Sequence, residues 1–176
     1  MTPVHLIAGF LGTGKTTAIG NWLKKRKNEQ VALIVNDFGE AGFDDIALNE
    51  EDPFSVQNIP GGCICCTAPE GFSDALRAVL ERNPDRIIIE PTGLARPQDL
   101  VDVILRPPLS STLKLAPVVV LVDPAQLGSA SKESKELVRE QAEAADVLVA
   151  NRIDLAEPED LEEFDRWASS LWPGPM

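Results

Sequence analysis

Residues 9–17 read GFLGTGKTT, and they directly follow the apolar run VHLIA at residues 4–8. A strand, a glycine-rich loop and the start of a helix in this order form a phosphate-binding P-loop. Gly9, Gly12 and Gly14 allow the backbone to fold tightly enough for successive amide N–H groups to converge on phosphate oxygens. We therefore expect a protein that binds a nucleoside triphosphate.

Two side chains of this loop complete the expected phosphate site. Lys15 places a positive charge near the β- and γ-phosphates, and the Thr16 hydroxyl is a hard oxygen ligand for Mg²⁺. We expect Lys15 to be an exposed loop lysine that supports phosphate rather than the core. The helix that begins at Lys15, and that we expect to reach about Lys27, directs its positive dipole end at the anion.

Short apolar runs alternate with amphipathic stretches along the rest of the chain. Further buried strands are expected at residues 31–35, 86–89, 118–122 and 147–150, and further helices at 70–82, 132–145 and about 161–171. This alternation predicts an α/β P-loop fold, a mainly parallel sheet with helices on both faces and with ligands at the carboxyl ends of its strands.

The chain has 176 residues and a net charge of -12, which fits one domain of ordinary size. Without a basic stripe, nucleic acid and anionic membranes are poor candidate partners. The basic run KKRK at residues 24–27 is interpreted as the solvated end of the first helix. The sequence offers neither a membrane-length apolar stretch nor a signal sequence, so we expect a cytoplasmic protein.

Two further segments are candidates for contact with the γ-phosphate. Glu90 ends an expected strand beside the P-loop, where a second-sphere Mg²⁺ ligand would act in catalysis, and Gly93 can offer its N–H to the phosphate. The loop NDFGEAGFDD at residues 36–45 lies where a switch region would sense that group. Asp37 in this loop is a candidate for holding Mg²⁺ or orienting the attacking water.

Residues 151–154 read NRID and follow an expected strand at the position of the guanine-reading N-K-x-D element. The Asp154 carboxylate can accept hydrogen bonds from the N1–H and the exocyclic amine of guanine, a donor pair that adenine does not offer. Arg152 replaces the usual lysine, and its guanidinium can also stack on a ring. Together with Asn151, this element favours GTP over ATP.

All three cysteines, Cys63, Cys65 and Cys66, fall within four positions, which suggests reduced thiols rather than a disulfide framework. Soft thiolates suit Zn²⁺, Co²⁺ or Cu(I) and lose their protons on binding. Three ligands are one short of a closed tetrahedral site, so we expect an open site completed by water, by a carboxylate such as Glu40 or by a partner. The only histidine, His5, is interpreted as a core residue of the first strand.

In chain order, the motifs GFLGTGKTT, NDFGEAGFDD, GGCICC, EPTGLARP and NRID resemble those of the CobW-type GTPases of the CobW/HypB/UreG family. The resemblance runs from Val4 to Asp154. It implies a metallochaperone that hydrolyses Mg²⁺-bound GTP to GDP and phosphate and that delivers Zn²⁺ or Co²⁺ from the CxCC thiols to a client metalloprotein or metal-cofactor enzyme. The expected nucleotide contacts are Gly12, Thr13, Gly14, Lys15, Thr16, Thr17, Gly93, Asn151 and Asp154. Lys15, Glu90 and Asp37 are the expected catalytic residues.

The chain departs from the family pattern in three respects. Asp37 stands where the family usually has glutamate, and Arg152 where it has lysine. We expect the chain to lack the family's C-terminal domain and its frequent histidine-rich stretch, which would contact clients. We expect residues 1–176 to form one GTPase domain, either naturally short or ending before its last strand, that dimerises in a nucleotide- or metal-dependent way.

Two other functions stay open at the level of the sequence. A small-molecule P-loop kinase would need an arginine-rich phosphate-binding lid, and the chain has no such cluster. A non-catalytic metal-binding or sensor module would keep its nucleotide affinity but turn over negligibly.

Overall fold

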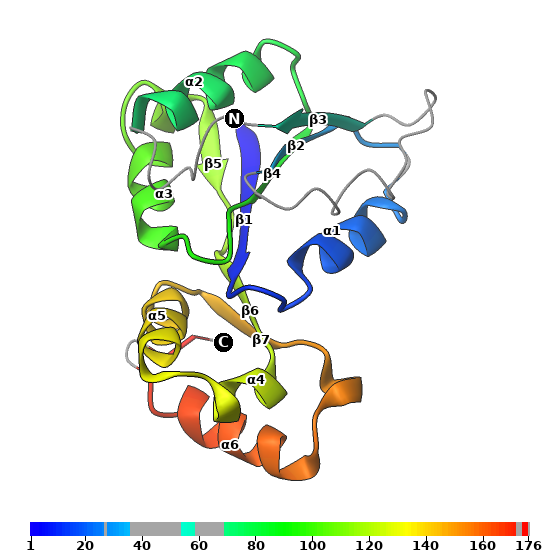
Figure 1. The fold of residues 1–176 in the computed structure, drawn as a ribbon. Helices are drawn as coiled ribbons and strands as arrows, with labels where there is room; N and C mark the ends of the chain where they lie inside the picture. The colour runs from blue at the N-terminus through cyan, green and yellow to red at the C-terminus, as the bar shows by residue number, and fades with distance from the viewer. Residues whose placement is uncertain (27, 36–53, 59–68, 172–173, 176) are drawn as a thin grey trace.

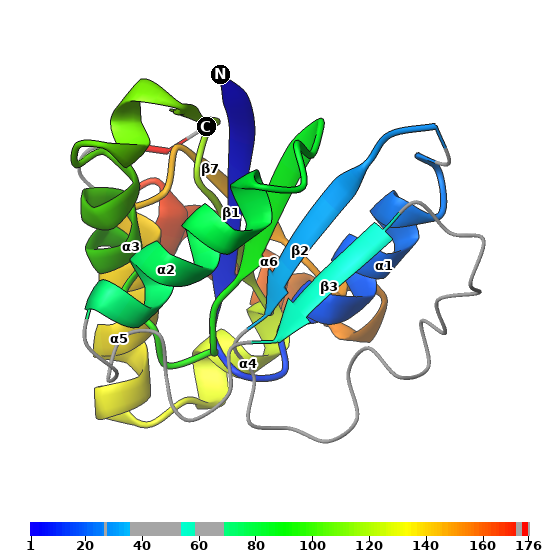
Figure 2. The same cartoon turned by 90° about the horizontal axis from the view of Figure 1, so that it is seen from above.

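The computed structural model describes residues 1–26, 28–35, 54–58, 69–171 and 174–175. In these residues, one seven-stranded sheet has the order β3-β2-β4-β1-β6-β7, with the short β5 pairing β1 beside β6 (Figures 1 and 2). The strands are β1 (Thr2–Gly9), β2 (Val31–Val35), β3 (Phe54–Asn58), β4 (Arg86–Glu90), β5 (Leu113–Leu115), β6 (Val119–Val122) and β7 (Val147–Ala150). All of their pairings are parallel, which confirms the predicted α/β sheet.

The helices that the structure describes are α1 (Lys15–Leu23), α2 (Pro69–Leu80), α3 (Pro97–Ile104), α4 (Pro124–Ser129), α5 (Lys132–Glu143) and α6 (Pro158–Ala168). The structure also describes two short 3-10 turns, η1 (Leu109–Ser111) after α3 and η2 (Ile153–Leu155) before α6. No helix among them is both long and apolar enough to cross a lipid bilayer.

The sheet is covered on both faces, as predicted. Alternate residues of a strand point to opposite faces, so Leu33 and Ile88 pack with Ile19 of α1. Their neighbours Ile34 and Ile89 belong to the larger cluster formed with α2, α3 and α5. Figure 2 shows α1 on one side of the sheet and α2 and α3 on the other. This double cover explains why β2 is an unbroken apolar run, all of it buried.

The first helix ends earlier than the sequence suggested. It stops at Leu23, and the N–H groups of Lys24 and Arg26 donate to carbonyls four and three residues back, which tightens the last turn. The Arg26 side chain lies 5.2 Å from the centre of the Trp22 ring and pairs with Glu29 at 2.8 Å. The described part of the basic run is exposed, as expected, but it follows the helix instead of forming its last turn.

His5 lies half-buried in β1, and its Nε2 atom is in hydrogen-bond contact with Nη1 of Arg86. Arg86 also pairs with Glu29 at 3.1 Å and lies over the ring of Trp22. Burial, and then the neighbouring guanidinium, hold the pKa of His5 below its ordinary value of 6.5. The histidine is thus a partnered strand residue that favours the neutral form, but it is half-buried and does not belong to the core, contrary to its interpretation from the sequence.

Because unfolded His5 takes up its proton near pH 6.5 and folded His5 only at lower pH, acidification through this range should destabilise the protein. We expect the free energy of unfolding, measured in urea, to decrease from about pH 7.5 to about pH 5.5. His5→Gln keeps an acceptor for Arg86 but does not titrate, so it should flatten this decrease. An equally steep decrease in the variant would assign the effect to other groups.

Candidate nucleotide site

The carboxyl ends of four neighbouring parallel strands carry the motifs singled out in the sequence. β1 leads into the P-loop, β4 ends at Glu90, β6 is followed by Asp123, and β7 is followed by Asn151. Because these ends lie at one edge of the sheet, side chains far apart in the chain meet there. The topology therefore builds one site from segments about 140 residues apart, as the contact of Asn151 with Thr13 shows.

The P-loop backbone has the wrapped conformation that a phosphate cradle needs. Gly9, Gly12 and Gly14 have φ angles of 141°, 75° and 84°. Gly14 is the N-cap residue of α1, and a Cβ atom there would lie 2.7 Å from the Asn151 Nδ2 atom. A side chain at this position would be strained both by its backbone angle and by its neighbour.

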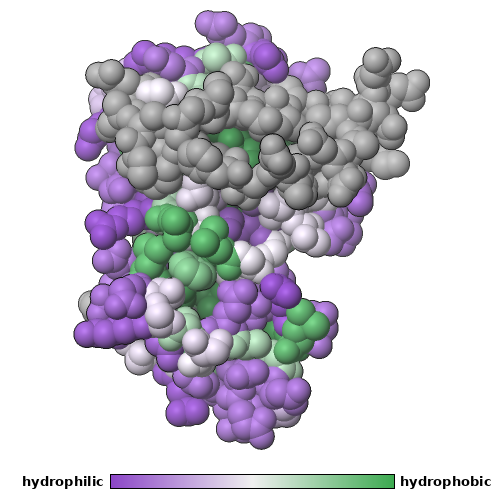
Figure 3. Space-filling model, viewed as in Figure 1, coloured by the Kyte–Doolittle hydropathy of each residue, from purple (hydrophilic) through white to green (hydrophobic). Residues whose placement is uncertain are grey.

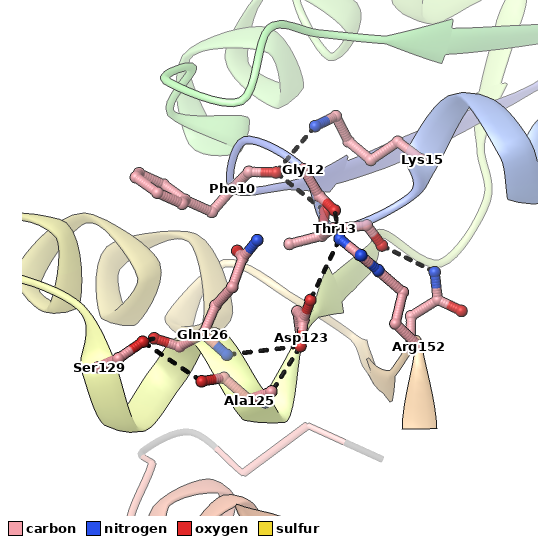
Figure 4. A network of polar contacts seen from close by, with 10 residues as sticks. Phe10, Gly12, Thr13, Lys15, Asp123, Ala125, Gln126, Ser129 and Arg152 are labelled. Atoms are coloured by element: carbon pink, nitrogen blue, oxygen red, sulfur yellow. Dashed lines mark hydrogen bonds and ion pairs between the residues drawn. The ribbon is translucent and has the colours of Figure 1, made fainter. Parts of the chain in front are cut away.

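The side chain of Lys15 is buried, with 8% of the residue exposed, so the expectation of an exposed loop lysine is wrong. Its Nζ atom donates to the carbonyl oxygens of Gly9 and Phe10, each at 3.0 Å, and Figure 4 shows the bond to Phe10. These backbone acceptors satisfy the ammonium group, which makes its burial tolerable. Lys15 therefore braces the loop as well as offering it a positive charge.

Thr16 and Glu90 meet between α1 and β4. The Thr16 hydroxyl donates to Oε1 of Glu90 at 2.6 Å, and Glu90 is 1% exposed. A hydroxyl and a carboxylate in contact at the end of a P-loop are hard oxygen donors of the kind that Mg²⁺ prefers. The structure thus brings together the two residues that the sequence suggested for a magnesium ion.

The Gly93 loop, defined as residues 92–96, lies directly against the P-loop. A Cβ atom on Gly93 would overlap the backbone of Leu11, so only glycine permits this approach. The loop is tightened by the N–H groups of Leu94 and Ala95, which donate to the hydroxyl and the carbonyl of Thr92 at 3.1 and 3.0 Å. Gly93 is therefore close enough to the P-loop for its peptide to face a bound triphosphate.

Segment 151–154 is attached to the P-loop by two hydrogen bonds. Nδ2 of Asn151 donates to the Thr13 carbonyl, and Nη1 of Arg152 donates to the Gly12 carbonyl, each at 2.7 Å. Figure 4 shows Arg152 beside Gly12 and Asp123. These bonds hold Asp154, which is exposed, at a fixed distance from the phosphate loop.

Asp123 is a site residue that the sequence reasoning missed. It is 4% exposed, one carboxylate oxygen caps α4 by accepting from Ala125 N at 3.0 Å, and the other lies 3.4 Å from Arg152. The arginine that replaces the usual lysine therefore has a buried anionic partner. An aspartate directly after an apolar run and before Pro124 is a typical helix cap, which is the signal that could have identified it.

A cavity of about 480 Å³ opens where these segments meet. It is lined by Gly12, Gly14, Thr17, Ala18, Asn21, Asn151, Arg152 and Asp154. Ala18 and Asn21, which the sequence did not suggest, follow Gly14 by four and seven positions, so together with Thr17 they line one side of α1. The volume lies in the range of small-molecule sites, and the lining joins the P-loop to Asp154.

A second cavity, of about 210 Å³, has a different character. Its lining is mostly apolar and includes Phe10, Leu11, Leu127 and Val138. Leu11 and Leu94 are also exposed, at 47% and 55%, and Figure 3 shows apolar residues gathered near the middle of one face. Such a lining does not suit a phosphate chain, so the polar cavity is the candidate nucleotide site.

The family comparison agrees with this geometry. The chain matches the model of the CobW/HypB/UreG nucleotide-binding domain over residues 3–174. The chain belongs to this family. The predicted resemblance is therefore confirmed.

Two curated relatives illustrate the similarity. The zinc chaperone YeiR of Escherichia coli K12 is 39% identical over 169 residues, which cover 95% of this chain and 51% of YeiR. The zinc-regulated GTPase metalloprotein activator 1 of Schizosaccharomyces pombe is 31% identical, with coverage of 90% of this chain and 41% of the relative. The chain thus spans about half the length of the curated relatives it matches.

Solved structures show the same fold. The zinc-bound YjiA GTPase of E. coli superposes with a TM-score of 0.64 at 22% identity, covering 95% of this chain and 54% of YjiA. The hydrogenase maturation factor HypB of Archaeoglobus fulgidus gives a TM-score of 0.61 at 18% identity, covering 94% of this chain and 76% of HypB. At these identities the likeness concerns the fold.

Four of the expected site residues, Asp37, Cys63, Cys65 and Cys66, lie outside the described residues. In the part of the chain that is described, no cluster of three or more histidine, cysteine, aspartate or glutamate side chains could hold a metal ion. The cysteine metal site and the role of Asp37 therefore stay predictions.

Proposed function

We propose that this domain binds and hydrolyses GTP, and that it couples this cycle to the binding and delivery of a zinc or cobalt ion. The observation that carries the proposal is the cavity of about 480 Å³ in which the P-loop and Asp154 share one lining. Membership of the CobW/HypB/UreG family, and the zinc chaperones and GTPases among its relatives, support the same function.

Guanine selection is assigned to the segment 151–154. A carboxylate at position 154 offers two acceptor oxygens to the paired donors of guanine, whereas adenine presents an acceptor at the corresponding position. The bonds from Asn151 and Arg152 to the P-loop support this role because they fix the reading group relative to the phosphates.

The phosphate end is assigned to the P-loop and the strand end at Glu90. Lys15 can exchange its two carbonyl acceptors for phosphate oxygens, and Gly93, which lies against Leu11 of the P-loop, would offer its N–H to the γ-phosphate. Thr16 and Glu90 would hold Mg²⁺, which when bound neutralises charge on the β- and γ-phosphates. Asp37 is proposed to orient the attacking water.

The cargo ion is assigned to Cys63, Cys65 and Cys66. Three thiols in four positions support this assignment, because deprotonated thiols are soft ligands and an incomplete set allows the ion to be passed on. A reducing compartment such as the cytoplasm would keep the thiols available. The acceptor would be a client metalloprotein or metal-cofactor enzyme, and nucleotide or metal would control dimer formation.

The wild-type protein should bind GTP and GDP at least about 100-fold more tightly than ATP, because a site built for the guanine donors rejects a base that lacks them. Asp154→Asn should weaken GTP binding and shift the preference toward xanthosine triphosphate, which offers a carbonyl to the new amide. Fluorescence titrations with the four nucleotides test this. Asp165→Asn, an exposed aspartate on α6, is the matched control. Equal affinity of the wild type for ATP and GTP would refute guanine recognition.

One preparation can separate the proposed GTPase from its alternatives. Metal stoichiometry and GTP turnover are measured together. A metallochaperone GTPase binds about one equivalent of Zn²⁺ and releases phosphate. A sensor module binds both ligands but releases no phosphate, and a kinase transfers phosphate only to an added acceptor.

A further inference from the structure

Helix α5 buries a glutamine against the Gly93 loop. Gln141 is 1% exposed, and its Nε2 atom donates to the carbonyls of Gly93 at 3.1 Å and Ala95 at 2.9 Å. A carboxamide nitrogen carries two N–H donors, and here both bond to one loop. The orientation of the amide is fixed, because the reverse orientation would turn its oxygen toward two carbonyl oxygens.

The position of Gln141 on the helix is one where an apolar residue would be expected. Val138 and Ala142, three positions before and one after, are both buried against the core. Among the residues that the structure describes, Oε1 of Gln141 has no hydrogen-bond partner. A buried amide whose oxygen has no hydrogen-bond partner stabilises the fold less than an apolar side chain of the same size. Its two donated bonds are therefore the reason for a glutamine at this position.

These bonds hold the Gly93 loop, which follows β4 and lies against the P-loop. Gly93 lies against the Leu11 backbone, and on its other side its carbonyl is bonded to Gln141. The neighbouring ion pair of Arg96 with Glu140, at 3.0 Å, joins the same loop and helix. Both of its side chains are about half exposed or more, so solvent screens this pair. The buried amide is the stronger constraint on the loop.

We propose that Gln141 is a positioning residue that holds the Gly93 loop against the P-loop and so sets how the protein distinguishes GTP from GDP. The proposal rests on the proposed GTPase function. Gly93 lies against the Leu11 backbone of the P-loop. If its N–H contacts the γ-phosphate, as the proposed function has it, loosening the loop should affect binding of the triphosphate and spare binding of the diphosphate. Helix α5 also leads through β7 to Asn151, so the same helix connects the Gly93 loop to the guanine-reading segment.

The test compares the wild type with Gln141→Met, which keeps the side-chain length and removes both donors. The dissociation constants of GDP and of a non-hydrolysable GTP analogue are measured, together with single-turnover hydrolysis. We expect the GDP value to stay within about twofold while the analogue binds about tenfold more weakly, because part of its binding free energy must then order the loosened loop. Hydrolysis should slow by about tenfold or more. Gln98→Met, an exposed glutamine on α3, should change none of these values.

If Gln141 has a structural role alone, Gln141→Met should weaken the binding of GDP and of the GTP analogue equally, or of neither. Either result overturns the proposal. Hydrogen exchange at the Leu94 and Ala95 amides is a measurement that needs no nucleotide. Exchange should accelerate in Gln141→Met, and unchanged exchange would show that Gln141 does not hold the Gly93 loop. If the wild type binds no guanine nucleotide, the proposed function fails, while the exchange result still shows whether Gln141 holds the Gly93 loop. If the methionine variant does not fold, Gln141→Glu is measured in the same way. Glutamate has the same size as glutamine but carries an oxygen in place of the donating NH2 group.

Discussion

Replacing Lys15 by alanine is expected to weaken GTP binding on the order of 100-fold, which corresponds to two charge-assisted hydrogen bonds worth ~3 kcal/mol together. Hydrolysis should fall below detection, because the same ammonium group would face the charge that develops on the γ-phosphate. The burial of Lys15 adds a second effect. Its bonds to Gly9 and Phe10 brace the P-loop, so alanine should also lower the melting temperature slightly.

Two further variants separate charge from packing. Lys15→Met keeps the buried aliphatic stem and removes only the charge, so it should lose GTP affinity as the alanine variant does but melt closer to the wild type. Lys25→Ala removes an exposed lysine just beyond α1 and should leave both properties unchanged. GTP turnover that survives in Lys15→Met would show that another basic group supports the phosphates.

Changing Cys65 and Cys66 to serine is expected to abolish tight metal binding. The wild type should bind about one equivalent of Zn²⁺ or Co²⁺, with thiolate-to-cobalt charge-transfer absorption and release of protons as the thiols ionise. The chain has three cysteines, so the double variant leaves only Cys63, which cannot chelate the ion. The charge-transfer band should disappear in the variant.

GTP binding is the internal control for the cysteine variant. The nucleotide cavity is lined by other residues, so GTP affinity measured without metal should be largely unchanged. A cobalt complex of the wild type without a thiolate band would remove the metallochaperone part of the proposal and leave a plain GTPase.

The parts of the fold that could be predicted are those with strong sequence patterns. The strand β2 coincides with the run 31–35, because a strand buried on both faces must be apolar throughout. The strand β3, FSVQN, mixes polar with apolar residues at the edge of the sheet, and β5 is only three residues long. Neither carries a pattern that stands out from a loop.

Two short helices, α3 and α4, also escaped prediction. Both have proline as their first residue, after Arg96 and Asp123 respectively. A proline after a strand end predicts a turn, although proline is equally favourable at the first position of a helix. At eight and six residues, these helices are too short for their periodicity to decide between the two.

Side-chain contacts of the site were predictable only in part. The P-loop and segment 151–154 could be paired from their motifs. The contact of Thr16 with Glu90 follows from their places at the start of the helix after the P-loop and at the end of a neighbouring strand. The burial of Lys15 depends on which loop carbonyls turn inward, which no spacing reveals. Gln141 did leave a signal, because it is a polar residue three positions after Val138 on the apolar side of a helix.

We expect the nucleotide site and the metal site to influence each other, and the affinity for Zn²⁺ in two nucleotide states tests this coupling. A chromophoric chelator competes for Zn²⁺ with the protein bound either to GDP or to a non-hydrolysable GTP analogue. We predict dissociation constants that differ by about tenfold or more, and the nucleotide affinities must then change with metal by the same factor. Equal Zn²⁺ affinity in the two states would show that the two sites are not coupled.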